Sequence, residues 1–441
     1  MSDLKKIYEL YIKSKQNVCI DTRSKKIKNS IFFALKGTKY NGNLFAQEAI
    51  KKGAKYIVVD EPFETNDKRI IKVKNTLKTL QKLAIIHRSN WGENKFVIGI
   101  TGTNGKTTTK EILNQILSSS LNINSTKGNL NNHIGVPLTI LALNNNHTGC
   151  IVELGANHQG EIKELCRIAN PTHGIITNIG EAHLEGFKDV DTIIKTKNEL
   201  YNYIKKNGGT IFVNKLDSRL VNLINKYDKV VFYSCEQQNE HNKINNNLFY
   251  FLAKPFLTLY YQGHIINTKI IGQYNAQNLA ASIKISETFN VNLKNTIQVL
   301  EKIELKNNRS QFIKTNNNEI ILDAYNANPT SVKLAIENFK EIMQIEKSDN
   351  NNTLIIGDML ELGPKSNQYH QDIVKLISSL GFKKCVLIGE NFMLTKTIKE
   401  YKKFISLKDY IDFLRKEPIK NHYILIKGSR KMQLEKLIDI L

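Results

Sequence analysis

The residues best able to do chemistry lie in the segment FVIGITGTNGKTTTKEIL, residues 96–113. Its first six residues form an apolar run typical of a buried strand, a glycine turn follows, and the apolar spacing from Lys106 onward predicts a helix. Backbone N–H groups at such a helix start point at phosphate oxygens, and the helix dipole favours the anion. The pattern predicts a phosphate loop for ATP or GTP, in which Lys106 reaches the β- and γ-phosphates and the Thr107 hydroxyl binds Mg²⁺. The nucleotide-binding residues expected here are Gly102, Thr103, Asn104, Gly105, Lys106, Thr107 and Thr108.

The spacing departs from the standard phosphate-loop pattern at one position. That pattern places a glycine at position 100, where this chain has Ile100 and carries Gly99 one residue earlier. An incidental glycine turn before a helix is the alternative interpretation, and the strand and helix context disfavours it.

Two downstream segments supply groups that could bind a metal ion beside this loop. In CIVELGANHQGEI, Glu153 ends an expected strand, and a carboxylate at the carboxyl edge of a parallel sheet can hold Mg²⁺. His183 follows the expected strand Ile175–Thr177. A lone histidine after a strand is more often structural than a ligand, but the phosphate loop and the carboxylate favour a functional role. Lys195 and Lys197, in the helical pattern TIIKTKNEL, have the features of solvated surface lysines.

The elements that must position these residues follow an α/β pattern. Short β-branched runs alternate with helical patterns, which predicts largely parallel sheets. Strands are expected at Val18–Asp21, Ile31–Ala34 and Tyr56–Val59, and again in LIIGD, CVLIGE and YILIKG of the last third. With 441 residues, we expect three domains: a small α/β domain (1–92), a central phosphate-loop domain with a mostly parallel sheet (93–313) and a Rossmann-like C-terminal domain (314–441).

Composition narrows the classes of protein. Hydrophobic residues make up 41% and charged residues 24%, which excludes disorder throughout. No apolar run reaches the roughly 18 residues of a membrane span, and the first residues show no apolar signal segment, so we expect no membrane insertion. The five cysteines form no C-x-x-C pair, which argues against disulfides and a zinc cluster and favours the cytoplasm.

The chain is basic, with 63 Lys and Arg against 41 Asp and Glu and a formal net charge of +22. Residues 1–92 alone carry 20 basic and 8 acidic residues. A lysine-rich composition explains much of this charge, and no run of five basic residues indicates a nucleic-acid tail. The uneven charge fits anionic small molecules better than nucleic acid, since a positive field steers them.

Several segments together resemble the Mur ligase family of ATP-dependent amide-bond-forming enzymes. TGTNGKTTT, ELGANHQGEI, TNIGEAHLEGF and GQYNAQNLAAS occur in the order expected of that family. ILDAYNANPTSVKLAIENF, IIGDMLELG and LIKGSR resemble the members that add D-alanyl-D-alanine to UDP-N-acetylmuramoyl-tripeptide. CIDTRS and IFFALKGTKYNGNLFAQEAIKKGA resemble their uridine-nucleotide-binding domain. The resemblance covers nearly the whole chain.

The resemblance implies a catalytic and metal-binding set. Glu153 and His183, with Thr107, correspond to ligands of two Mg²⁺ ions. Lys197 corresponds to a lysine that the family carries as a carbamate formed from CO₂, and such a carbamate can hold the second ion. It needs a neutral amine, hence a lowered pKa. The implied catalytic residues are Lys106, Glu153, His183, Lys197 and Arg309.

The resemblance also implies contacts to the nucleotide and to the other substrates. Asn275 and Asn278 correspond to adenine contacts, and Tyr274 stands where many members have histidine. Arg309 and Asp323 correspond to residues that bind phosphate and nucleotide as domains close. The implied substrate contacts are Asp21, Thr22, Arg23, Ser24, Lys36, Gly37, Asn41, Gly42, Asn326, Asn328, Ser331, Lys427 and Ser429. The first eight are equally compatible with ordinary turns, and Asn-Pro-Thr-Ser is ordinary helix capping.

The implied reaction has two steps, an acyl phosphate forming from the tripeptide carboxylate and ATP before the dipeptide amine displaces phosphate. Closure of the last domain would exclude water, and we expect a monomer. Two alternatives stay open. The preceding ligase of the family would carry a D-N-P-R motif, whereas this chain has Asn326-Ala327-Asn328-Pro329-Thr330. A nucleic-acid-dependent ATPase would carry basic and aromatic clusters that we do not find. The third residue of the tripeptide, meso-diaminopimelate or lysine, is left open.

Overall fold

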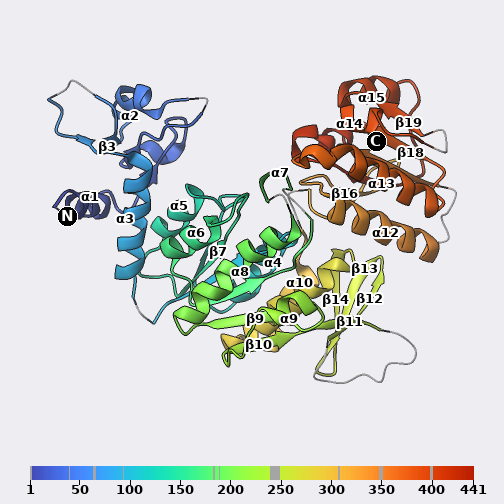
Figure 1. Ribbon diagram of the computed structural model, residues 1–441, viewed down its shortest axis with the longest axis horizontal. Coiled ribbons are helices and arrows are strands. Elements are labelled where there is room, and N and C mark those ends of the chain that lie inside the picture. The colour runs from blue at the N-terminus through green and yellow to red at the C-terminus, as the bar shows by residue number, and fades with distance from the viewer. Residues whose placement is uncertain are drawn as a thin grey trace.

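The computed structural model describes residues 2–38, 40–62, 66–92, 94–181, 184–187, 189–238, 249–305, 308–346, 351–397 and 401–441. These residues form four β-sheets flanked by helices, an α/β architecture as predicted. Figure 1 shows the N-terminal and C-terminal sheets on opposite sides of a larger central part. None of the helices in the described part of the chain is both long and apolar enough to cross a bilayer.

The N-terminal sheet has four parallel strands in the order β1-β2-β3-β4. The buried β-branched and aromatic residues of β2 and β3 explain why these segments form strands covered on both faces. The three strands expected from the sequence are present; the third has the expected bounds, Tyr56–Val59, and the first two are shorter. The elements are α1 (Ser2–Lys13), β1 (Val18–Cys19), η1 (Lys25–Ile27), β2 (Ile31–Phe33), η2 (Gly42–Phe45), α2 (Ala46–Lys51), β3 (Tyr56–Val59), β4 (Ile70–Lys72) and α3 (Thr76–Asn90).

Helix α3 joins this sheet to the central part. Its buried residues Leu80, Leu83 and Ala84 share one hydrophobic core with residues of α5, α6 and α8. His87 Nε2 contacts the Leu143 carbonyl at 2.8 Å, and Trp91 Nε1 donates to the Asn144 carbonyl at 2.8 Å. The N-terminal sheet is therefore attached through a packed helix.

The central sheet has six parallel strands in the order β10-β9-β8-β5-β7-β6, which confirms the predicted parallel sheet. Strand β5 lies between β7 and β8, so the residues that follow these three strands emerge side by side. This arrangement puts the phosphate loop next to Glu153 and Asn178. The strands are β5 (Phe96–Thr101), β6 (Ile123–Ser125), β7 (Gly149–Glu153), β8 (His173–Ile176), β9 (Thr210–Asn214) and β10 (Val230–Tyr233).

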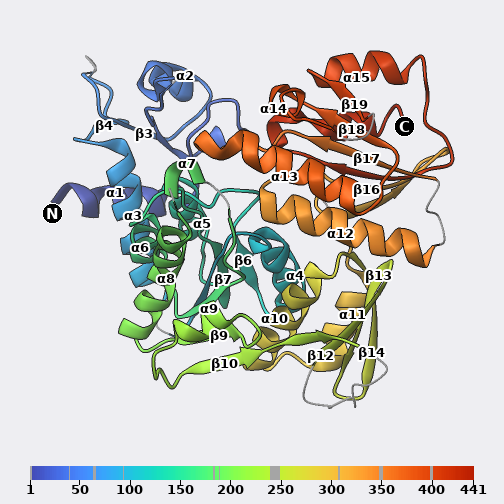
Figure 2. The same ribbon diagram turned by 45° about the vertical axis from the view of Figure 1, so that its right-hand side comes forward.

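Helices cover both faces of the central sheet, and alternate residues of β5 therefore pack in two different hydrophobic cores. Val97 packs with α5, α6 and α8, whereas Ile98 and Ile100 pack with α4, α10 and α11. Helices α4 and α10 lie side by side in Figures 1 and 2. The helices are α4 (Lys106–Ser118), α5 (Gly135–Leu141), α6 (Glu161–Ala169), α7 (Leu184–Phe187), α8 (Val190–Lys206), α9 (Ser218–Asn222), α10 (Tyr274–Thr288) and α11 (Leu293–Lys302).

A second sheet of the central part was not predicted from the sequence. Strands β12, β13 and β14 pair antiparallel, and β11 pairs parallel with β12. The alternating burial of β13 shows that one face packs on the core formed with α4, α10 and α11. The strands are β11 (Cys235–Gln237), β12 (Phe249–Lys254), β13 (Phe256–Tyr261) and β14 (His264–Ile271).

The C-terminal sheet is mixed, in the order β15-β16-β20-β17-β18-β19, with β15 antiparallel to β16 and the other pairs parallel. Helices α12 and α13 pack on the face turned toward the central part, as Figure 2 shows. The elements are β15 (Gln311–Lys314), β16 (Glu319–Asp323), α12 (Pro329–Ile345), β17 (Asn352–Gly357), η3 (Gly363–Lys365), α13 (Ser366–Ser379), β18 (Cys385–Ile388), α14 (Glu390–Met393), β19 (Lys402–Phe404), α15 (Leu407–Leu414), β20 (Tyr423–Lys427), η4 (Arg430–Met432) and η5 (Leu434–Leu437). Strand β15 spans the expected division at 313/314 and belongs to this sheet.

Helix α4 must stay packed on the central sheet to hold the phosphate loop, so we expect Leu113→Ala to destabilise the protein. Leu113 is fully buried, and the cavity left by its side chain should lower the free energy of unfolding by about 2–5 kcal/mol. Leu216→Ala is the control: that side chain is 52% exposed and should change stability by less than about 0.5 kcal/mol. Calorimetry should show a lowered unfolding temperature for Leu113→Ala and not for Leu216→Ala. Equal unfolding temperatures for the two variants would contradict this packing.

Candidate functional site

The phosphate loop begins where β5 ends and closes at the first residue of α4. Gly102 has φ +142°, and a Cβ there would lie 2.0 Å from Thr177 Oγ1. Gly105 has φ +78°, and its Cβ would lie 2.8 Å from Asn278 Oδ1. Both positions therefore require glycine, because any side chain would meet both strain and a neighbour. The predicted strand, turn and helix are all present.

Residues after β8 fix the loop from the side. The Asn104 N–H donates to Asn178 Oδ1 at 3.0 Å, and Asn178 Nδ2 donates back to the Asn104 carbonyl at 3.0 Å. Thr177 Oγ1 donates to the same carbonyl at 2.6 Å. Thr103 Oγ1 bonds both the carbonyl and the N–H of Gly180. These bonds preorganise the loop backbone.

Lys106 turns its ammonium into the loop. Its Nζ donates to the carbonyls of Gly102 at 2.7 Å and Thr103 at 2.9 Å. Burial lowers the pKa of Lys106 to about 8, Glu153 opposes that shift, and Arg309 adds to it. Burial thus disfavours the charged form of this amine, and a bound anion would stabilise that form.

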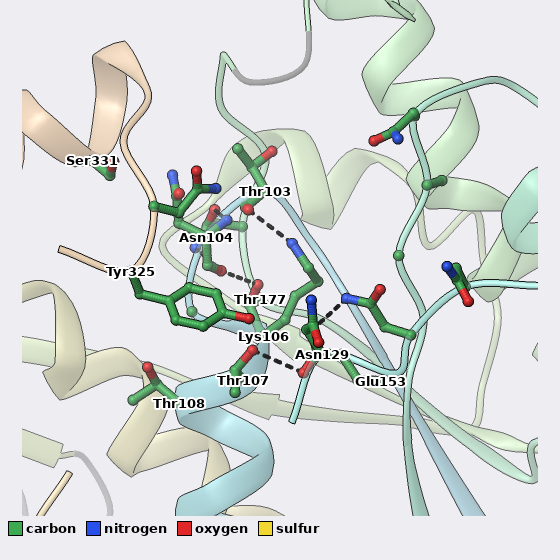
Figure 3. Close-up of a pocket in the computed structure, with 18 of the residues that line it drawn as sticks. Thr103, Asn104, Lys106, Thr107, Thr108, Asn129, Glu153, Thr177, Tyr325 and Ser331 are labelled. Carbon is green, nitrogen blue, oxygen red and sulfur yellow. Dashed lines mark hydrogen bonds between the residues drawn. The ribbon is translucent and has the colours of Figure 1, made fainter. Parts of the chain in front are cut away.

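Thr107 and Glu153 meet as the sequence predicted for a magnesium site. Thr107 Oγ1 donates to Glu153 Oε2 at 2.9 Å (Figure 3). Asn131 Nδ2 donates to Glu153 Oε1 at 2.8 Å. Arg309 Nη2 donates to Thr107 Oγ1 at 3.1 Å, although it lies 202 residues further along the chain. A hydroxyl and a carboxylate side by side are the hard oxygen donors that Mg²⁺ prefers, so these residues fit that ion.

Arg309 and Asn104 keep donors unused inside the site. Arg309 Nε and Asn104 Nδ2 are buried and have no hydrogen-bond partner in the part of the chain that the structure describes. Buried donors without partners are costly, and phosphate oxygens would satisfy them. The phosphate loop, the Arg309 guanidinium and these donors thus fit a polyanion.

The asparagines assigned to adenine form one cluster on α10 against the loop. Asn278 Oδ1 accepts from Thr109 Oγ1 at 3.2 Å, and Asn278 Nδ2 donates to Asn275 Oδ1 at 3.0 Å. Both side chains are buried. Tyr274 packs against Gly272 and bonds Ser310 Oγ at 2.6 Å, and its pKa is raised by burial and by Asp323.

Asp323 forms an ion pair with the buried Lys427. Lys427 Nζ lies 2.8 Å from Asp323 Oδ2 and donates to the Asn326 carbonyl at 2.7 Å. Asp323 Oδ1 also accepts from the Ser310 N–H at 3.3 Å. Lys427, which the sequence predicts to contact substrate, lines the cavity and also holds the 323–326 turn. Ser429 Oγ accepts from the Leu360 N–H at 3.0 Å.

Asn328 both caps α12 and reaches the phosphate loop. Its Oδ1 accepts from the Ser331 N–H at 2.8 Å in a capping box, while its Nδ2 donates to Asn104 Oδ1 at 2.8 Å. Thr330 Oγ1 accepts from the Glu181 N–H at 3.3 Å. The start of α12 therefore rests directly on the central part.

Lys197 is not the solvated lysine that its helical pattern indicated. It is buried in α8, and its Nζ lies 5.4 Å from the centre of the Phe187 ring. Burial lowers its pKa to about 7, and Lys106 adds to the shift while Glu161 and Glu199 oppose it. Lys195 is exposed on the same helix. His183 lies outside the described residues.

The residues assigned to the uridine nucleotide lie at the carboxyl edge of the N-terminal sheet, where they bond to one another. Arg23 pairs with Asp21 at 2.8 Å and holds the pKa of that carboxyl at about 2, while Thr22 Oγ1 donates to Glu48. Ser24 caps η1, and Lys36 and Asn41 both donate to Glu61. Gly37 and Gly42 directly follow Lys36 and Asn41 in the chain.

A cavity of about 1150 Å³ connects the phosphate loop with Glu153, the α10 asparagines and Asp323. The residues assigned to the uridine nucleotide do not line it, and neither do Lys197, Asn328 and Ser429. The cavity runs from α3 past the phosphate loop to the C-terminal sheet. Asn131, Tyr325 and Arg430 are among the lining residues that sequence reasoning missed. No local pattern marks them, because each matters only through a partner distant in the chain. Among the described residues, no group of three or more His, Cys, Asp or Glu side chains is arranged to hold a metal.

Two family models match the chain: the Mur ligase middle domain over residues 100–286, and the Mur ligase, glutamate ligase domain over residues 308–430. A Rickettsia prowazekii protein named UDP-N-acetylmuramoyl-tripeptide–D-alanyl-D-alanine ligase is 33% identical, with 93% of this chain and 92% of the relative covered. The Bacillus subtilis protein of that name is 30% identical, with 96% and 92% covered. The crystal structure of MurF from Acinetobacter baumannii is similar with a TM-score of 0.81 at 28% identity, covering 96% and 92%.

The lowered pKa of Lys106 predicts how nucleotide binding depends on pH. The protonated amine is the form that attracts phosphate, so the Kd for a non-hydrolysable ATP analogue should rise as pH increases beyond about 8. The slope should approach, at most, about tenfold per pH unit. Isothermal titration between pH 6.5 and 9.5 measures this, and Lys106→Met supplies the baseline for titration of the nucleotide itself. Identical profiles for the two proteins would refute the assignment.

Proposed function

Because the chain belongs to the Mur ligase family, we propose that it joins D-alanyl-D-alanine to UDP-N-acetylmuramoyl-tripeptide with hydrolysis of ATP to ADP and phosphate. The observation that carries this proposal is that relatives with this named activity match over nearly the full length of both chains. The arrangement of Lys106, Thr107 and Glu153 at the phosphate loop supports the ATP-dependent step. The product is the UDP-MurNAc-pentapeptide used for peptidoglycan.

In the first step, a carboxylate oxygen of the tripeptide bonds to the γ-phosphorus of ATP, and the bond from that phosphorus to the β-γ bridging oxygen breaks. ADP leaves and an acyl phosphate forms. Two anions must approach each other, so neutralising charge is the main task of the site. Lys106 and Arg309 supply cationic donors on two sides of Thr107, and Thr107 and Glu153 would hold Mg²⁺.

In the second step, the amine of D-alanyl-D-alanine bonds to the acyl carbon, its proton leaves to solvent or a base, and phosphate departs. Water would compete by hydrolysing the acyl phosphate. The contacts from Asn328 to Asn104 and from Glu181 to Thr330 support a closed arrangement that limits solvent access. We assign Asn326, Ser331 and Lys427, which line the cavity, and the nearby Asn328 and Ser429 to binding of the dipeptide.

The nucleotide would lie between α10 and the C-terminal sheet. Asn275, Asn278 and Tyr274 would contact adenine, and Asp323 the ribose end, since these groups line the same cavity as the phosphate loop. The N-terminal residues 21–24, 36–37 and 41–42 would hold the uridine diphosphate at the carboxyl edge of their sheet. We assign the three expected parts, 1–92, 93–313 and 314–441, to three domains of a monomeric, cytoplasmic enzyme, with the last boundary moved ahead of β15, which belongs to the C-terminal sheet.

We propose that Lys197 carries a carbamate. Carbamylation requires a neutral amine, and burial beside Lys106 lowers the pKa of Lys197 to about 7, so a large share of this amine is neutral at physiological pH. A carbamate would replace one of two neighbouring cations by an anion. Together with Glu153, Thr107 and His183, the carbamate would hold the second Mg²⁺. That ion would neutralise charge and bind phosphate oxygens.

The ligase activity is tested by phosphate release from ATP with purified UDP-MurNAc-tripeptides. Release should require both the tripeptide and D-alanyl-D-alanine, and mass spectrometry should show the pentapeptide. Tripeptides with meso-diaminopimelate and with lysine are compared to identify the third residue. Absence of dipeptide-dependent release with both tripeptides would refute the proposed function, and nucleic-acid-stimulated release would replace it.

Lys197→Ala should lower kcat by at least about 100-fold, because the loss of one charge-stabilising group at a phosphoryl-transfer site is typically worth that much. Lys195→Ala, an exposed lysine of the same helix, should retain full activity. Carbon-13 NMR after addition of labelled bicarbonate should show a carbamate signal in the wild type and the Lys195 variant only. An active Lys197→Ala enzyme, also in CO₂-depleted buffer, contradicts the carbamate.

A further inference from the structure

Arg309 reaches the phosphate loop from a turn that does little to orient it. The residues on both sides of it, Asn308 and Ser310, have left-handed backbones with φ +58° and +46°. Its Nη2 bonds Thr107 Oγ1, and its Nε is buried without a partner among the described residues. Its side chain therefore needs support from outside its own turn.

That support comes from Tyr325. The Arg309 Cζ lies 3.7 Å from the centre of the Tyr325 ring, a close cation–π contact in a partly desolvated site. The Tyr325 N–H donates to the Asn308 carbonyl at 3.1 Å, so the ring and the arginine turn are also tied through the backbone. Figure 3 shows Tyr325 extending from the C-terminal part toward Thr107.

Arg430 holds the same ring from the C-terminal sheet. Its Nη1 donates to the Tyr325 hydroxyl at 3.1 Å, and its Cζ lies 4.9 Å from the ring centre. A continuous series of contacts thus runs from η4 through Tyr325 and Arg309 to the first turn of α4. Both arginines line the cavity that holds the phosphate loop.

We propose that Tyr325 is a positioning residue that aims Arg309 at the phosphate end of the nucleotide, with Arg430 fixing its ring. This inference rests on the proposed function, because Arg309 is taken to neutralise the transferred phosphoryl group. Tyr325 itself donates nothing to the reacting atoms. It makes the placement of Arg309 depend on the C-terminal sheet being seated on the central part.

The test is a double-mutant cycle with Tyr325→Leu, Arg309→Ala and the variant with both changes. Loss of the ring should lower kcat of the wild type by roughly 2- to 30-fold, the range of a cation–π contact. The same change in the Arg309→Ala background should cost less than about twofold, because the ring then has no arginine to aim. A merely structural role would give equal losses in both backgrounds, and that result would overturn the proposal.

Conservative variants sharpen the result. Tyr325→Phe keeps the ring and should retain most of kcat, with about a two- to fivefold loss from the hydroxyl contact with Arg430. Tyr56→Leu is the matched control: a lysine lies over that ring at 5.8 Å, but Tyr56 belongs to β3 and does not line the cavity. It should leave kcat unchanged.

Two safeguards keep the outcome clear. If Tyr325→Leu does not fold, Arg430→Gln is placed in the same two backgrounds, and equal losses there also overturn the proposal. The cycle is repeated on the Kd of a non-hydrolysable ATP analogue, which needs no ligase activity. A wild type without dipeptide-dependent phosphate release refutes the proposed function, whereas an active wild type with additive losses in both readouts refutes only the role of Tyr325.

Discussion

The hydrogen bond between Thr107 and Glu153 depends on one constraint, that β5 and β7 end side by side in a parallel sheet. Parallel neighbours bring their carboxyl ends to the same edge, so the loop after β5, the carboxylate ending β7 and the amide after β8 converge without any long-range signal in the sequence. The glycines of the loop then admit Thr177 and Asn278 at distances that no other residue would allow. The rest of the site is built onto this edge.

The electrostatics of the site follow from its burial. Burial lowers the pKa of both Lys106 and Lys197; Arg309 adds to the shift of Lys106, and Lys106 adds to that of Lys197. The carboxylates of Glu153, beside Lys106, and of Glu161 and Glu199, beside Lys197, only partly oppose these shifts. Such a group of cations is unfavourable by itself and becomes favourable when a polyanion enters, so part of the cost of assembling it is recovered on binding. The burial that lowers the pKa of Lys197 is also what supports the carbamate that we propose for its amine.

The C-terminal part contributes polar contacts to the site. Asn328 uses its carbonyl oxygen to cap α12 and its amide nitrogen to reach Asn104, so one side chain stabilises the helix and connects it to the loop. Lys427 uses its charge to hold Asp323 and the turn that presents Tyr325. Contacts of this kind can form and break as the parts move, which suits an enzyme that must admit three substrates.

The sequence by itself determined the α/β class, the phosphate loop and the strand-end carboxylate. Each rests on local rules, since glycine turns, helical periodicity and buried strands are set by neighbouring residues. The antiparallel β12–β14 sheet was not predicted, because only the pairing of its strands distinguishes them from a buried helix or a loop. The helical pattern around Lys197 indicated a surface lysine, because the burial of this side chain depends on α7 and α8 packing together. The tyrosine between two arginines and the Lys427–Asp323 pair, 104 residues apart, exist only in the tertiary structure, because nothing local distinguishes these residues from others of their type.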